Sequence, residues 1–277
     1  MQVSQHMLER ITKVSNSLRY NKPKPLSVSA VLNALKEPFD AVAVATKCNA
    51  NPNSQYFGMG VDVIVAGWAN KGSFAANRGM GLDEYVQASL NLDMCPISEG
   101  EQNEDESVTV RNSARKFMIV PSTLVKRATW FDIFKRDVLE RAGYSLVGSE
   151  LWLNSSAGVR GRSDAIFERE DALSVFDWKN SENIEYSNPW RKCLGPLAQY
   201  DDCDAVKFTT QVYLYKYLLE LDYGVHVQAT RVIQFNDTGY FIRKPAYLYD
   251  ASLIRECIEW AKTINNAERN SQESHTA

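Results

Sequence analysis

Two apolar segments separated by a short charged run constrain the fold of this chain most strongly. Residues 159–167 and 172–179 are rich in apolar and aromatic side chains, and the four residues between them are all charged. This pattern predicts two antiparallel strands joined by a tight turn. If the turn is centred on Glu170–Asp171, Asp164 lies opposite Asp177 or one step away. Cross-strand neighbours are roughly 5 Å apart, so the hairpin brings two carboxylates together.

The end of the second strand carries residues suited to metal-dependent phosphodiester chemistry. Strand side chains alternate between faces, so Asp177 and Lys179 point one way and Trp178 points the other. Hard divalent ions such as Mg²⁺ bind one or two carboxylates together with water and phosphate. Such an ion activates water and stabilises a charged transition state, and a nearby lysine neutralises the phosphate or helps to deprotonate the water. The alternative is a surface hairpin whose aspartates have no catalytic role.

A third motif follows on a segment with a helical pattern. Residues 207–223 have threonines near their start and Gly224 just past their end, which are helix boundary signals. Gln211 and Tyr215 lie within this segment, and residues four apart share one helix face. The two side chains therefore project together, although Tyr215 also suits a purely structural place in a helix rich in tyrosine and leucine.

A Gly-x-x-Asp motif, an Asp-x-Lys motif after an apolar strand and a Gln-x-x-x-Tyr motif on a following helix together resemble the PD-(D/E)xK nuclease superfamily. The resemblance is closest to its RecB-type exonuclease branch, which includes the mitochondrial genome maintenance exonuclease and the CRISPR adaptation nucleases. It spans residues 25–261 and is strongest over 150–215. It implies an α/β fold, with a restriction-endonuclease-like mixed β-sheet core flanked by helices and an N-terminal helical layer.

The resemblance also implies a set of metal ligands. It assigns the metal to Asp164 and Asp177, with the backbone carbonyl of Trp178 as a further ligand. Glu150, one predicted strand earlier, is a candidate third carboxylate, because the family often carries a glutamate there; the alternative is a surface glutamate on an edge strand. Asp83 stands where the family has a histidine, and as a carboxylate it can also bind a hard metal ion.

Other residues are implied to act on the substrate. Lys179 positions or activates the attacking water, and Gln211 and Tyr215 orient the lysine and the phosphate. Three further cations near these motifs are candidates for contacts with the phosphate backbone: Arg162, Arg191 and Lys192.

These features predict a DNA exonuclease that depends on Mg²⁺ or Mn²⁺ and acts on single strands or DNA ends, in recombination, repair or phage genome processing. Two other functions remain open: a site-specific or structure-specific endonuclease of the same fold, and a non-catalytic DNA-binding factor built on a decayed nuclease. The intact Asp164, Asp177 and Lys179 argue against decay, and the Gln-x-x-x-Tyr motif favours the exonuclease branch. Cleavage polarity, strand preference and oligomeric state are open.

The charge balance limits how the chain contacts DNA. Its formal net charge is −3 over 277 residues, with 44% hydrophobic and 23% charged residues, which is ordinary for a globular protein. Proteins that bind nucleic acid through many phosphates are often basic, so positive charge here must be local. The acidic run 99–106 predicts a solvated loop.

Cysteine usage indicates a reduced intracellular setting, cytoplasmic or nucleoid. The five cysteines form no Cys-x-x-Cys motif, while basic residues between positions 10 and 24 leave organelle targeting open. Some relatives hold an iron–sulfur cluster through one cysteine before the core and three close together near the end. The spacing of Cys193, Cys203 and Cys257 does not match, so no such cluster is expected. No run of eighteen apolar residues occurs, so no membrane partner is expected.

The remaining pattern predicts one nuclease domain over residues 1–265. A mainly helical layer covers 1–142, an α/β catalytic core covers 143–265, and a polar tail follows over 266–277. Further helices are predicted over 1–20, 123–142 and 251–265, and further strands over 147–153, 226–234 and 239–244.

Three segments have weaker patterns. Residues 27–95 are expected to be mostly helical with breaks at Gly72 and Gly79–Gly81, and 96–112 to form a polar loop. The connection 182–205 is too long for a simple turn. It is either a substrate-binding loop or a surface loop packed by Trp190.

Overall fold

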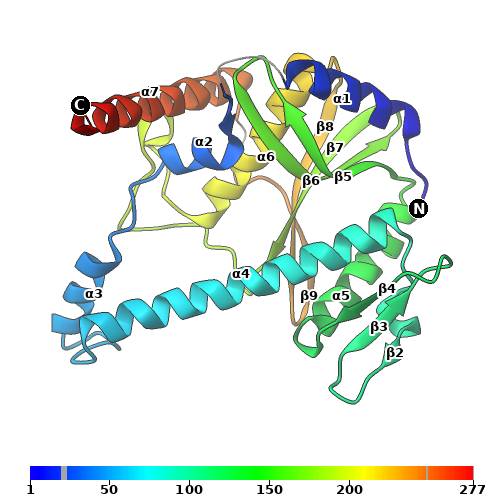
Figure 1. Cartoon of the computed structure of the whole chain (residues 1–277), viewed down its shortest axis with the longest axis horizontal. Coiled ribbons are helices and arrows are strands. Elements are labelled where there is room, and N and C mark those ends of the chain that lie inside the picture. The colour runs from blue at the N-terminus through cyan, green and yellow to red at the C-terminus, as the bar shows by residue number, and fades with distance from the viewer. Residues whose placement is uncertain (20–23, 248, 277) are drawn as a thin grey trace.

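A six-stranded mixed sheet lies at the centre of the computed structural model, which describes residues 1–19, 24–247 and 249–276 (Figure 1). The strand order is β1-β6-β7-β8-β9, and β5 pairs with β6. The strands are β1 (Leu26–Ser27), β5 (Ser145–Asn154), β6 (Val159–Arg169), β7 (Ala172–Asn180), β8 (Val227–Asn236) and β9 (Gly239–Arg243).

Seven α-helices are found among the described residues, and the mixed α/β class predicted from the sequence is confirmed. They are α1 (Gln5–Leu18), α2 (Val28–Ala34), α3 (Ala41–Ala50), α4 (Val61–Asn91), α5 (Ser122–Phe134), α6 (Asp204–Asp222) and α7 (Ala251–Thr276). A π-helical segment, Lys135–Glu140, continues α5, so the predicted helix over 123–142 is present. None of the helices in the described ranges is both long enough and apolar enough to cross a membrane.

The predicted hairpin of β6 and β7 is confirmed with its register. Ala165 pairs with Phe176, and this pairing sets Asp164 directly opposite Asp177. Glu170 and Asp171 form the turn with φ values of 55° and 60°. A two-residue hairpin turn with both central residues at positive φ has the twist that matches antiparallel strands.

Strand β6 has two different partners along one edge. β7 pairs with residues 165–169 of β6, and β1 pairs in parallel with residues 159–160. Neither of these ladders includes residues 161–164. Asp164 therefore lies where β6 and β7 part, while β5 pairs along the other edge of β6.

Helices cover both faces of the sheet, and each face has its own hydrophobic core. α1, α2, α6 and α7 enclose one core, which includes Val175 of β7. α4 and α5 enclose the other, which includes Phe176 and Trp178. The alternation along β7 thus directs Trp178 into the α5 core, and Lys179 contacts α6 through Gln211, as the strand pattern predicts.

The helix breaks predicted at Gly72 and Gly79–Gly81 are wrong. α4 continues without interruption through Gly72, Gly79 and Gly81. An added Cβ at Gly81 would lie 2.6 Å from Cδ1 of Leu124 in α5, so the glycine permits close packing of the two helices. This tertiary contact offsets the low helix propensity of glycine.

The predicted polar loop over 96–112 is also wrong. A small antiparallel sheet is built there from β2 (Glu101–Gln102), β3 (Val108–Arg111) and β4 (Phe117–Val120). Val108, Val110 and Val120 are buried against the core of α4 and α5, while the acidic residues of the run 99–106 are exposed as predicted.

The C-terminal helix is longer than predicted. α7 runs from Ala251 to Thr276, through most of the segment predicted as a polar tail, and Ala277 lies outside the described residues. The first part of the helix is held by its buried apolar face, since Ile254, Ile258 and Ala261 pack in the core beside α6.

Arg127 of α5 is fully buried and holds three segments together. Its guanidinium donates to Asp237 in the β8–β9 turn (2.8 Å), and to Asn180 and Glu182 at the end of β7. Asn180 in turn donates from its side chain to the carbonyl of Arg78 in α4 (2.6 Å). This network fixes the end of β7 against both α4 and α5.

We expect Arg127→Ala to lower the free energy of unfolding by about 2–4 kcal/mol, because it removes a large buried side chain and three hydrogen bonds. This loss of free energy lies at the lower end of the range for breaking a buried ion pair, since the partner carboxylates of Glu182 and Asp237 are half-exposed and can be hydrated. Urea unfolding measures the change. The control Arg136→Ala removes an exposed arginine paired with Asp137, and an equal urea midpoint for the two variants would contradict the role of Arg127.

Candidate active site

A buried ion pair forms the centre of the candidate site. Asp177 is 1% exposed, and its Oδ2 lies 2.7 Å from Nζ of Lys179. Apart from this ion pair, neither carboxylate oxygen of Asp177 has a hydrogen-bond partner among the described residues. Burial raises the pKa of Asp177, Lys179 opposes this rise and Asp164 adds to it. The buried carboxylate of Asp177 is thus compensated only by Lys179 among the described residues, and a second positive charge beside it would stabilise it further.

Asp164 is fixed by the backbone of the neighbouring strand. Its Oδ2 accepts a hydrogen bond from the backbone N–H of Trp178 (2.9 Å). This bond joins β6 to β7 just beyond their last ladder pair, at the point where the strands part. The side chain of Trp178 packs on the opposite face, with Phe131 and Phe134 of α5. The N–H of Trp178 thus contacts a carboxylate while its side chain points away, as the strand alternation predicts. A role of its carbonyl as a metal ligand stays a prediction.

Lys179 is held by groups on β7 and α6. Its Nζ donates to Oε1 of Gln211 (3.4 Å) and lies 4.8 Å from the ring centroid of Phe208. Burial acts to lower the pKa of Lys179, but the carboxylates of Asp177 and Asp164 outweigh it, and the net shift is upward. The lysine is consequently a charged ammonium at neutral pH.

Tyr215 contacts the strand rather than the lysine. It is buried in the α6 core, and its hydroxyl donates to the backbone carbonyl of Arg162 (2.7 Å). An added Cβ at Gly161 would lie 2.7 Å from Cε1 of Tyr215 and 2.5 Å from Cγ2 of Val28. The glycine of the Gly-x-x-Asp motif thus lets α2 and α6 approach β6 closely, and Tyr215 fixes the strand that carries Asp164.

Glu150 lies opposite Asp164 in the pairing of β5 with β6. It stands between residues paired with Ala165 and Ser163, and its φ is 53°. Its side chain is only partly buried and forms an ion pair with Arg162. Burial raises the pKa of Glu150, and the charge of Asp164 raises it further while Arg162 opposes the rise. Glu150 therefore lies across from Asp164 with its charge offset by Arg162, and its role as a third ligand stays a prediction.

Asp83 of α4 is partly buried and acts electrostatically on the same residues. Burial raises its pKa to about 7, Asp164 and Glu150 raise it, and Lys179 and Arg162 oppose the rise. A role of Asp83 as a metal ligand stays a prediction.

The charge of Asp164 acts on carboxylates from three other elements: Asp83, Glu150 and Asp177. Within the described ranges, no three His, Cys, Asp or Glu side chains form a tight group of the kind that holds a metal ion. The carboxylates are instead engaged by Lys179, Arg162 and a backbone N–H.

The chemistry of these residues nevertheless fits a hard divalent ion. The donors are carboxylate oxygens, which Mg²⁺ and Mn²⁺ prefer. The oxygens of buried Asp177 have no partner other than Lys179 among the residues described, and a buried charge without full pairing costs free energy.

The two cations predicted from the long connection are paired within their own loop. Arg191 contacts Asp202 (3.1 Å) and donates to the carbonyl of Glu37, and Lys192 contacts Asp201 (2.6 Å). Trp190 is 89% exposed, so the alternative in which it packs this loop is wrong. A role of the loop in substrate binding stays a prediction.

Lys207 and Phe208 were missed by the sequence reasoning. Lys207 lies 5.8 Å from the ring centroid of Phe208, the same ring that Lys179 contacts. Helical spacing could have identified Lys207, because it lies four residues before Gln211 and so shares its helix face.

All five cysteines are free, and Cys193, Cys203 and Cys257 pack in the same core. Burial raises the pKa of both Cys193 and Cys257 to about 12. These thiols are consequently protonated at neutral pH and behave as small apolar core residues.

No protein-family model matches this chain, and no curated protein matches it. A solved structure, that of SSO0001, is similar over 94% of this chain and 84% of its own, with 11% sequence identity and a TM-score of 0.33. A TM-score this low does not show a shared fold.

The raised pKa of Asp83 predicts how metal-free protein responds to pH. A carboxyl whose pKa rises from 3.8 to about 7 on folding binds more protons in the folded state. The contribution of this carboxyl to the free energy of unfolding is therefore fully present below about pH 4 and is lost as pH rises through about 7. With a chelator present, we expect Asp83→Asn to raise the free energy of unfolding by roughly 1–3 kcal/mol at pH 8 and to change it little at pH 4.

Urea unfolding at the two pH values measures this difference. The matched control is Glu84→Gln, which removes an exposed carboxylate from the same turn of α4 and should change stability by less than about 0.5 kcal/mol. A gain for Asp83→Asn that is the same at both pH values would show that titration of this carboxyl is not the cause.

Proposed function

We propose that this protein is a metal-dependent nuclease that hydrolyses phosphodiester bonds in DNA, acting from strand ends. The observation that carries this proposal is the buried pair of Asp177 and Lys179 beside Asp164, at the point where β6 and β7 part. Gln211 on the lysine adds the third motif. The order of these motifs resembles the RecB-type exonucleases, and that resemblance supports DNA as substrate and attack from ends.

Five groups would hold Mg²⁺ or Mn²⁺. Asp164 and Asp177 would be the principal ligands, the backbone carbonyl of Trp178 would be a further one, and Asp83 and Glu150 would supply additional carboxylates. A bound ion of this kind activates water and stabilises the charge that develops on the phosphate.

Lys179 would act on the phosphate by its charge. Asp177 and Gln211 hold its Nζ in place, and its raised pKa keeps the ammonium protonated. A protonated lysine neutralises negative charge in the transition state and donates hydrogen bonds to phosphate or water. Tyr215 supports this geometry indirectly, since it fixes the backbone of the strand that carries Asp164.

A comparison of linear and covalently closed circular DNA in the presence of Mg²⁺ tests the proposal. Degradation of linear DNA alone supports the end-dependent nuclease. Cleavage of the closed circle supports an endonuclease of the same fold, and DNA binding without cleavage of either substrate supports a non-catalytic factor.

The first variant tests the carboxylate at the centre. We expect Asp177→Asn to reduce cleavage at least about 10³-fold, because the amide cannot replace the charge that holds the ion. DNA binding should persist, since phosphate contacts come from other residues. The matched control Asp171→Asn makes the same change in the exposed hairpin turn. Normal turnover by Asp177→Asn would remove this residue from the site.

The second variant separates the lysine from the ligands. We expect Lys179→Ala to lower kcat at least about 100-fold even at saturating Mg²⁺, because a lost charge contact to the transition state is not replaced by more metal. Lys116→Ala, in an exposed segment before β4, is the control. Recovery of the wild-type rate of Lys179→Ala at high Mg²⁺ would show that the lysine acts only on metal affinity.

A further inference from the structure

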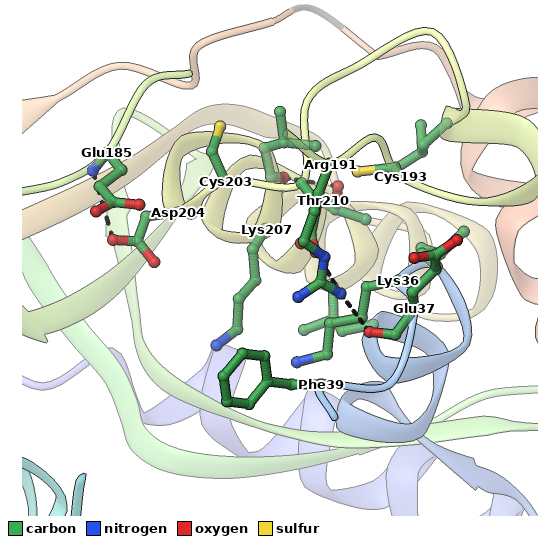
Figure 2. Close-up of a pocket in the computed structure, with 15 residues that line it drawn as sticks. Lys36, Glu37, Phe39, Glu185, Arg191, Cys193, Cys203, Asp204, Lys207 and Thr210 are labelled. Atoms are coloured by element: carbon green, nitrogen blue, oxygen red, sulfur yellow. Dashed lines mark hydrogen bonds and ion pairs between the residues drawn. The ribbon is translucent and has the colours of Figure 1, made fainter. Parts of the chain in front are cut away.

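A pocket beside the candidate active site contains three cations (Figure 2). It has a volume of about 260 Å³ and is lined by the segment after α2, by the β7–α6 connection and by the start of α6. Figure 2 shows the charged ends of Lys36, Arg191 and Lys207 pointing toward the region of the Phe39 ring. None of the site residues predicted from the sequence, except Arg191, lines this pocket.

The two lysines are free to bind an anion. Neither Lys36 nor Lys207 has an ion-pair partner within the described part of the chain, whereas Arg191 is balanced by Asp202. Four acidic residues also line the pocket: Glu37, Glu185, Asp202 and Asp204. Asp202 pairs with Arg191, and the charge of Asp204 acts on Lys207 without forming an ion pair with it.

The pocket is coupled to the candidate active site through α6. Lys207 and Lys179 contact the same Phe208 ring, at 5.8 and 4.8 Å from its centroid. Burial lowers the pKa of Lys207, the charges of Lys36 and Lys179 lower it further, and Asp204 and Asp177 oppose this effect. Lys36 and Lys179 therefore repel Lys207, and a bound anion would relieve that repulsion.

An aromatic ring lies next to these charges. Phe39 is 58% exposed, and its ring centroid lies 5.9 Å from that of Trp68 in α4. Exposed aromatic rings beside cationic side chains are platforms on which nucleobases stack, whatever their sequence. The pocket volume of about 260 Å³ lies just below the roughly 300–1,000 Å³ of sites for drug-sized ligands, so the pocket is too small for a duplex and takes at most one nucleotide.

We propose that this pocket binds the terminal nucleotide of a DNA strand, with the terminal phosphate between Lys36, Arg191 and Lys207 and the base against Phe39. The inference rests on the proposed nuclease function and names the feature of the substrate that the site recognises. A terminal phosphomonoester carries about −1.5 to −2 charges, more than the single charge of an internal diester. It is therefore the phosphate that benefits most from two unpaired lysines.

This arrangement gives a physical reason for attack from ends. A strand whose terminal nucleotide occupies the pocket passes Lys207 and then Lys179 on the way out of it. The phosphodiester bond presented to Asp177 and Lys179 is then one close to the end. Closed circles have no group that fills the pocket in this way.

Binding of short single strands tests the proposal without cleavage. The Asp177→Asn chain is titrated against three oligonucleotides with an internal fluorophore: one with a 5′-phosphate, one with a 3′-phosphate and one with hydroxyls at both ends. We expect one phosphorylated strand to bind at least about tenfold more tightly than the hydroxyl strand, as charge-assisted hydrogen bonds imply. The preferred end identifies which terminus the pocket accepts.

Variants of the pocket, made in the same Asp177→Asn background, locate the effect. Lys36→Ala and Lys207→Ala should each remove most of the preference for the phosphorylated strand while leaving affinity for the hydroxyl strand within about twofold. The matched control is Lys13→Ala, which removes an exposed lysine of α1 outside the pocket. Phe39→Ala should weaken all three strands alike, through loss of stacking. Circular dichroism confirms that each variant is folded.

The outcomes separate this inference from the proposed function. Equal affinity for phosphorylated and hydroxyl ends, or a preference unchanged in both lysine variants, would overturn the pocket assignment even for an active nuclease. A phosphate preference that depends on Lys36 and Lys207, in a chain whose wild type cleaves no DNA, would support the pocket and overturn the nuclease.

Discussion

The antiparallel pairing of β6 with β7 determines where every other part of the candidate site lies. The register that pairs Ala165 with Phe176 also sets Asp164 opposite Asp177, and the strands part just beyond that point. β7 then leads through a long connection into α6 and the parallel strand β8. This crossover brings Gln211 onto Lys179. The register of the hairpin thus brings the two carboxylates and the lysine together, and the crossover to α6 adds the amide.

The electrostatics of the site oppose its stability. Burial and the charge of Asp164 on β6 raise the pKa values of Asp83, Glu150 and Asp177, on α4, β5 and β7. Lys179 and Arg162 offset part of this repulsion through ion pairs. Several partly paired carboxylates that act on one another are unfavourable for folding, and this cost is the physical reason for the proposal that they bind a cation.

The sequence was sufficient for features that depend on local periodicity. The hairpin, the opposite directions of Trp178 and Lys179, and the helix of Gln211 follow from repeats of two and 3.6 residues. Features that depend on tertiary contacts were missed. α4 continues through its glycines because Gly81 packs on Leu124 of a distant helix. The strands β2–β4 have four residues or fewer, too few to show alternation, and the approach of Lys36 to Lys207 joins segments far apart in the chain.

The hydrogen bond from Asn180 to the carbonyl of Arg78 gives the long helix α4 a mechanical connection to the site. Asn180 directly follows Lys179, and Arg78 lies little more than one turn before Asp83 on α4. Arg127 of α5 donates to the same Asn180 side chain, so one residue joins α4, α5 and the end of β7. A displacement of α4 that breaks this bond would also move Asp83 relative to Asp164 and Glu150, on whose charges it depends. Under the proposed function, a cation bound by these carboxylates would therefore favour the present position of α4, and that position would favour the cation to the same extent.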